Sequence, residues 1–124
     1  MNLLKGNKSK IVFGYLLYSD KTKVTNLNTA VNVRWVLKHD LEDADSAAII
    51  SKSLGPSILI DTPSTSKITI ILETADTELV KAGIYYQALQ IEYPNDNIQE
   101  IIIMEKGKLS NIVYLLQDGV RAPV

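Results

Sequence analysis

Apolar and polar residues alternate along several short stretches of this sequence, and polar turns separate these stretches. In the segment 30–38, AVNVRWVLK, the alternation places four apolar side chains on one face: Val31, Val33, Trp35 and Leu37. Polar side chains occupy the opposite face, apart from Val36. A repeat of two residues is that of a half-buried β-strand. We therefore predict a strand here with the tryptophan in the core.

Other stretches have the composition of strands, because they are rich in β-branched residues and end at turn residues. They are the segments 10–18, 57–60, 67–73, 84–93, 98–106 and 107–116, with Gly107 as a bulge or bend in the last. The segment 46–53 is compatible with a strand or a helical turn. Short strands without alternating long helices predict an all-β fold, an antiparallel sandwich of roughly seven or eight strands.

The segment 76–85, DTELVKAGIY, is typical of the tyrosine corner of an immunoglobulin-like sandwich. In such a corner the tyrosine hydroxyl bonds back to the upstream backbone. Asp76 would cap a short helical turn, Gly83 would supply an unusual backbone angle, and Tyr85 would form the corner. Leu79 would fill the end of the core. A ligand groove edged by Tyr86 and Tyr93 is the alternative, but strand alternation places these two on opposite faces.

Composition limits the classes of function. The chain has 124 residues, 13 basic and 14 acidic side chains, and no cysteine. Disulfides and thiolate metal sites are excluded, and no basic field favours nucleic acid. No signal-peptide core and no apolar run long enough to span a bilayer occurs, so we expect synthesis in the cytoplasm and no membrane partner. We predict one domain over residues 1–124, with its core at about 10–116 and short flexible termini.

Candidate chemistry is sparse. His39 is the single histidine, and no nucleophile-elbow motif accompanies it. The acidic loop 40–45 contains four carboxylates, Asp40, Glu42, Asp43 and Asp45. Such oxygens suit calcium, but the loop lacks the glycine and distal glutamate of an EF-hand, and a solvated loop is the alternative. We predict no catalytic residue, cofactor or metal ligand, and therefore no enzyme.

Two stretches near the C-terminus are apolar on both strand faces, IIIM at 101–104 and IVYLL at 112–116. A strand of this kind is covered on both faces or forms an interface. The candidate interface residues are Ile102, Met104, Leu115 and Leu116. The other interpretation is a central strand whose outer face is covered by a loop.

The order of several motifs resembles that of a known family. The stretch KVTNLNTAVNVRWVLK at 23–38 comes first, followed by IISKS at 49–53. The corner motif of Asp76, Thr77, Leu79, Gly83 and Tyr85 follows, then LQI at 89–91 and a Gly-x-Leu step at 107–109. Together they resemble the immunoglobulin-like domains of tailed-phage virion proteins, such as the N-terminal domain of baseplate upper proteins. The resemblance covers about residues 11–113.

The resemblance implies a non-enzymatic structural protein of the virion, in the head decoration, the tail or the baseplate. Because the chain ends soon after the domain, we expect a small stand-alone virion protein, made in the host cytoplasm. Its partners would be other virion proteins, with a homo-oligomer as a further option. The alternative function is a carbohydrate- or cell-surface-binding module, with Tyr86, Tyr93 and Tyr114 as aromatic platforms.

Overall fold

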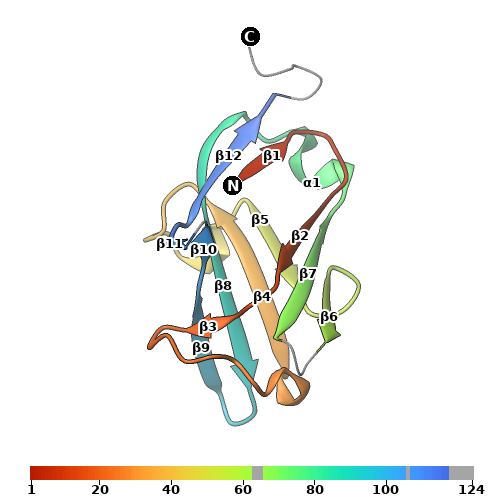
Figure 1. Cartoon of the computed structure of the whole chain (residues 1–124). Helices are drawn as coiled ribbons and strands as arrows, with labels where there is room; N and C mark the ends of the chain where they lie inside the picture. The colour runs from red at the N-terminus through yellow and green to blue at the C-terminus, as the bar shows by residue number, and fades with distance from the viewer. Residues whose placement is uncertain (63–65, 106, 118–124) are drawn as a thin grey trace.

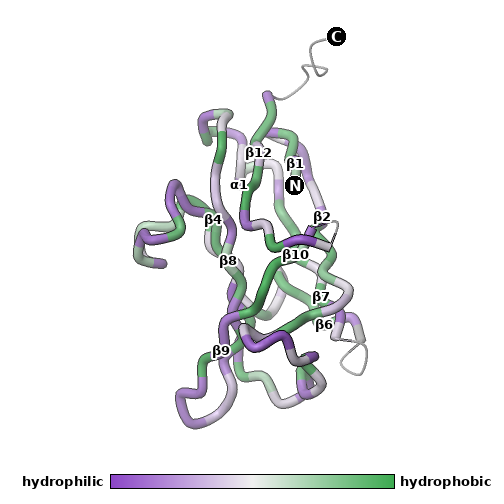
Figure 2. Tube along the Cα trace, turned by 60° about the vertical axis from the view of Figure 1, so that its left-hand side comes forward, coloured by the Kyte–Doolittle hydropathy of each residue, from purple (hydrophilic) through white to green (hydrophobic). Residues whose placement is uncertain are grey.

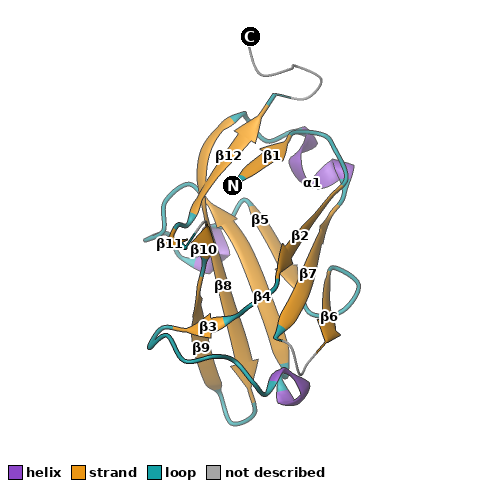
Figure 3. Cartoon of the chain, viewed as in Figure 1, coloured by secondary structure: helices purple, strands orange, loops and turns teal. Residues whose placement is uncertain are grey.

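A computed structural model describes residues 1–62, 66–105 and 107–117, and strands dominate these residues (Figures 1 and 3). The strands are β1 (Asn2–Leu4), β2 (Ser9–Phe13), β3 (Leu17–Tyr18), β4 (Asn32–Lys38), β5 (Ile50–Ser53), β6 (Ile58–Thr62), β7 (Lys67–Leu72), β8 (Gly83–Tyr93), β9 (Asn97–Ile102), β10 (Met104–Glu105), β11 (Lys108–Leu109) and β12 (Ile112–Leu116). The helical segments are α1 (Thr74–Glu78) and the 3-10 turns η1 (Leu27–Thr29) and η2 (Asp45–Ala47). The predicted all-β sandwich is confirmed.

The larger sheet has seven strands and is organised around β8. Along one side, β8 pairs with β4, which in turn pairs with β5. Along its other side, β8 pairs first with β12, over residues 83–86, and then with β9, over residues 89–93. The strands β1 and β3 extend the sheet beyond β12 and β9. Two different strands therefore flank the two halves of β8 on the same side.

The second layer is a three-stranded sheet in the order β2-β7-β6, and β10 and β11 form a small hairpin (Figure 1). Ile68, Ile70 and Leu72 of β7 are buried, as their alternation predicts. From β4 of the larger sheet, Val33, Trp35 and Leu37 are completely buried. Val31 was predicted to join them, but it precedes the strand and is 59% exposed.

The N-terminus is part of the fold. β1 runs parallel to β12, and Leu3 packs into the core. The N-terminal ammonium donates to a carboxylate oxygen of Glu105 at 2.6 Å. The core therefore begins well before residue 10, and the expected flexible N-terminus is wrong. The C-terminal residues 118–124 lie outside the described part of the chain.

The predicted strand 107–116 is divided in two. β11 pairs back with β10, with Met104 opposite Leu109, and β12 begins only at Ile112. Gly107 lies in the connection between β10 and β11 and has a φ of 78°. Glycine adopts this left-handed conformation without the steric cost of a Cβ atom. It therefore supports a turn between the two strands, so of the two predicted alternatives the bend agrees with the structure and the bulge does not.

The corner is only partly as predicted. The hydroxyl of Tyr85 donates to the carbonyl of Lys81 at 2.5 Å, the upstream backbone bond that defines a tyrosine corner. Asp76 belongs to a capping box whose N-cap is Glu73, and it pairs with Lys52 at 2.7 Å. Two details are wrong. Gly83 has no left-handed φ and has space for a Cβ atom, and Leu79 is 94% exposed instead of filling the core.

Candidate functional site

The outward-facing surface of the larger sheet is the main candidate for a binding surface. Along β8 the odd-numbered positions from Tyr85 to Tyr93 are buried, whereas the even-numbered ones are exposed or half-buried. The even positions are Ile84, Tyr86, Ala88, Gln90 and Glu92. In Figure 2, β12 lies beside β1 near the top of the molecule and β9 lies near the bottom. Because β12 flanks the first half of β8 and β9 the second, the side chains of this outer face fall into two parts with different chemistry.

The part beside β12 is apolar. Leu4 lies opposite Leu116, and Tyr114 lies opposite Ile84. Their exposed fractions are 40% for Leu4, 38% for Leu116, 42% for Tyr114 and 57% for Ile84. We call these four residues the apolar patch. They lie on adjacent strands and on one face, so they form a contiguous surface.

The part beside β9 is polar and hollowed. Arg34 of β4, Gln90 of β8 and Glu100 of β9 are neighbours across the three strands. They line a hollow of about 310 Å³. Arg34 and Gln90 also line an adjoining hollow of about 100 Å³, together with Asn32 and Glu92. We call these two hollows, with the acidic loop beside them, the polar groove.

The acidic loop 40–45 forms a wall of the polar groove. Lys38, whose side chain is 7% exposed, pairs with Asp45 at 2.7 Å and donates to the carbonyl of Asp43 at 2.9 Å. Gln90 of the neighbouring strand donates to the other oxygen of Asp45 at 2.9 Å. Since Asp45 contacts both β4 and β8, the loop lies over Val36, which explains why this outer-face residue is 2% exposed.

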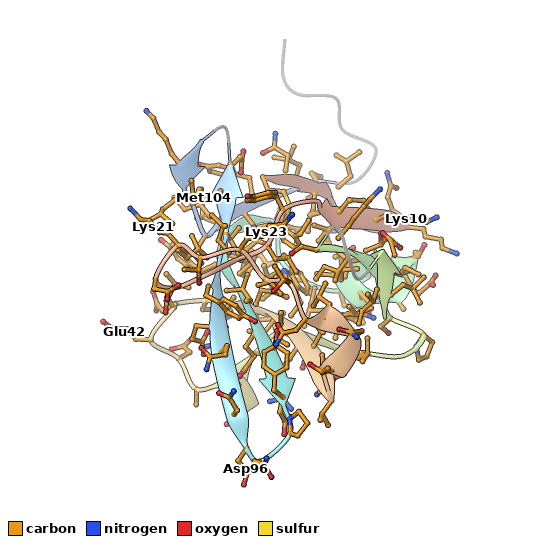
Figure 4. The ribbon with its side chains drawn as sticks, turned by 60° about the horizontal axis from the view of Figure 1, so that its bottom comes forward. Lys10, Lys21, Lys23, Glu42, Asp96 and Met104 are labelled. Atoms are coloured by element: carbon orange, nitrogen blue, oxygen red, sulfur yellow. The ribbon has the colours of Figure 1, made fainter. Side chains whose placement is uncertain are left out.

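This anchoring changes the interpretation of the acidic loop. Asp45 neutralises Lys38, while Glu42 is exposed and its side chain points away from the sheet (Figure 4). Within residues 1–62, 66–105 and 107–117, no group of three or more acidic, histidine or cysteine side chains is placed to hold a metal ion. The loop is therefore held by an ion pair and hydrogen bonds among its own neighbours.

The predicted interface residues do not gather at one place. Leu116 belongs to the apolar patch, and Ile102 is half-buried on the same outer face, opposite Leu17 of β3. Met104 is 43% exposed on the separate β10–β11 hairpin. Leu115 is 1% exposed and belongs to the core, so its assignment to a surface is wrong. It faces inward because it alternates with Leu116 and Tyr114.

The other singled-out residues are dispersed as well. Tyr86 and Tyr114 share the outer face, whereas Tyr93 is buried on the inner one, as alternation predicts. The hydroxyl groups of Tyr93 and Tyr18 are hydrogen-bonded at 2.6 Å, and both lie within hydrogen-bond distance of the side-chain oxygen of Asn26. Burial, with a smaller contribution from Tyr18, raises the pKa of Tyr93.

His39 is exposed, and the centre of its ring is 5.3 Å from that of Tyr85. Ser46, Ser51 and Ser53 are exposed, and no hydrogen bond joins His39 to any of the three. Ser64 lies outside the described residues. The arrangement around His39 thus matches aromatic packing at a strand end.

Sequence reasoning missed one buried polar pair. The indole nitrogen of Trp35 donates to the side-chain oxygen of Gln87 at 2.9 Å, and both side chains are buried. A polar residue in the middle of an otherwise apolar strand face was the available signal, since a buried amide needs a partner. The partner is the donor on the only tryptophan. This hydrogen bond joins the side chains of β4 and β8 within the core.

Comparison with known proteins gives no match, either to a protein-family model or to a curated protein. Among the described residues, none of the helical segments has the length and apolar character needed to cross a bilayer.

Proposed function

We propose that the protein is a non-enzymatic structural component of a phage particle and that it binds other virion subunits through the apolar patch. The phage assignment is supported by the order of motifs between residues 11 and 113. In this proposal the chain is made in the host cytoplasm and is then incorporated into the virion.

The apolar patch carries the binding part of the proposal. Four large apolar side chains, Leu4, Ile84, Tyr114 and Leu116, lie beside one another and are each between 38% and 57% exposed. Single exposed apolar residues need no explanation, but contiguous apolar patches on soluble domains mark interaction sites. Burial of the patch against another subunit would release about 25 cal/mol for each Å² removed from water.

The sheet edge adds a second contact. β1 is an edge strand of the larger sheet: it pairs with β12 on one side, and no strand of the described residues pairs with its other side. A subunit that covers Leu4 would also approach this edge. Association costs several kcal/mol of lost translational and rotational freedom, and the free energy gained at the interface must exceed this cost. Main-chain contacts at β1 would extend it.

A matched pair of variants tests the proposal. Ile84→Asp places a charge in the apolar patch, at a residue that is 57% exposed. Val12→Asp places the same charge on β2 of the other sheet, at a residue that is 53% exposed. Binding is measured by co-sedimentation with particles assembled without this chain, and self-association by light scattering.

Wild type and Val12→Asp should bind particles or self-associate, and Ile84→Asp should do neither while keeping the wild-type circular dichroism spectrum. A wild-type chain that stays monomeric and never co-sediments would overturn the virion proposal. Equal loss of binding in both variants would instead remove the apolar patch as the docking surface.

A further inference from the structure

We propose that the polar groove is a second binding site and that it binds a linear, predominantly neutral oligosaccharide. The groove lies on the same sheet face as the apolar patch but on different strands, beside β9 instead of β12. A carbohydrate ligand at this site is independent of the docking of virion subunits.

The first support is the shape of the groove. A hollow lined by Tyr86 and the acidic loop shares Leu41 with the central hollow, which shares Arg34 and Gln90 with the hollow beside Asn32. The three follow the outer positions of β8 from Tyr86 to Glu92. Six steps along a strand span about 20 Å. The site is thus long and narrow, which suits a chain-like ligand better than a compact one.

Arg34 is the second support. Its side chain is half-buried, and no carboxylate of the described residues lies within ion-pair distance of it. Lys38, which lies four residues further along β4 on the same face, is by contrast paired with Asp45. A guanidinium group carries five donors in a fixed plane, and those of Arg34 are open to solvent, since no buried side-chain nitrogen of the described residues lacks a partner. A ligand with many oxygen acceptors would satisfy them.

The position of the groove within the sheet argues against a peptide. Peptides that join a sheet do so at an unpaired strand edge through main-chain hydrogen bonds. The groove instead lies over β4 and β8, each of which is paired on both sides. A ligand here must be recognised by side chains. Its polar side chains include planar amide, carboxylate and guanidinium groups, namely Asn32, Arg34, Gln90, Glu92 and Glu100.

Charge narrows the ligand further. Along the three hollows the cationic side chains are Arg34 and Lys38, and the anionic ones are Asp40, Glu42, Asp43, Asp45, Glu92 and Glu100. Two positive and six negative charges leave the site with a negative balance, so a polyanion such as a nucleic acid or an anionic oligosaccharide would be repelled. Vicinal hydroxyl groups, which donate and accept at once, match such mixed polar groups. Ala88 supplies an apolar contact, and Tyr86 supplies an aromatic ring at one end.

The test uses the full chain and a printed array of linear oligosaccharides, both neutral and anionic, with calorimetry on soluble oligosaccharides that bind. We expect binding to neutral chains, with affinity that increases beyond the disaccharide. Arg34→Ala should weaken it about ten- to hundredfold. Arg34→Lys should weaken it too, because an ammonium cannot replace the planar donors.

Lys10→Ala is the matched control, since Lys10 is an exposed cation of β2 on the far side of the molecule from Glu42 (Figure 4). It should bind like the wild type.

No binding to any oligosaccharide, binding to extended peptides alone, or binding unchanged in Arg34→Ala would each overturn the proposal. If Arg34→Ala does not fold, amide shifts of the wild type on titration decide: shifts confined to β4, β8 and β9 support the site, and shifts elsewhere refute it. Ile84→Asp should bind oligosaccharide normally, which separates this proposal from that of virion docking.

Discussion

The two faces of the seven-stranded sheet are built from the same strands but differ in burial and in chemistry. On β8 the inward positions are buried around Trp35 of β4, whereas the outward positions run from apolar Ile84 to charged Glu92. The inner face is uniform, apart from the Trp35–Gln87 hydrogen bond. The outer face changes from the apolar patch to the polar groove where β12 gives way to β9. This difference indicates that the inner face determines stability, and we propose that the outer face determines binding.

The largest expected effect comes from Trp35, compared with its neighbour Arg34 on the other face. Trp35→Ala removes a completely buried ring and should lower the free energy of unfolding by about 3–5 kcal/mol. Arg34→Ala should stay within about 0.5 kcal/mol of the wild type. Denaturant unfolding measures both. Similar losses in the two variants would contradict the assignment of faces.

A smaller effect is expected for Gln87, compared with Gln90 on the outer face. Gln87→Leu leaves the buried indole N–H of Trp35 without an acceptor and should cost about 1–3 kcal/mol. Gln90→Leu removes a half-buried hydrogen bond to Asp45 and should cost less. The double variant Trp35→Phe/Gln87→Leu has neither the donor nor the acceptor. Its loss of unfolding free energy should therefore be smaller than the sum of the losses of the two single variants, which a double-mutant cycle measures. An absence of coupling would show that the hydrogen bond between Trp35 and Gln87 does not stabilise the fold.

The smallest effect is expected at the corner. Tyr85→Phe keeps the ring in place but removes the hydrogen bond to the carbonyl of Lys81, at a cost of about 0.5–1.5 kcal/mol. Tyr86→Phe, which changes a hydroxyl on the outer face, is the control and should be nearly neutral. Urea midpoints that shift equally in the two variants would remove the tyrosine corner as a stabilising element.

Alternation predicted the faces of β4, β7 and β8, because one side of each packs into the core and the other faces outward. It failed where both faces are apolar: Leu115 and Leu116 look alike in sequence, and only the pairing of β12 with β8 decides which one is buried. β1 was missed because its pairing with β12 joins residues more than 100 positions apart.

The candidate site was less predictable than the fold. The apolar patch depends on pairings among three strands, so Leu4, Ile84 and Tyr114 could not be grouped with Leu116 from local pattern. The polar groove depends on the loop that Lys38 holds over Val36, again a contact between distant elements. The unusual backbone angle predicted for Gly83 of the corner motif is wrong, since this residue has an ordinary backbone conformation.

The adjacent residues Leu115 and Leu116 test the division between the two faces most directly. Leu115 is 1% exposed and Leu116 is 38% exposed, on the same strand and with the same side chain. The measurement is the urea-unfolding free energy of Leu115→Ala and Leu116→Ala. We predict a loss of about 2–5 kcal/mol for Leu115→Ala and a change within about 0.5 kcal/mol for Leu116→Ala. Equal losses, or a larger loss at Leu116, would contradict the account.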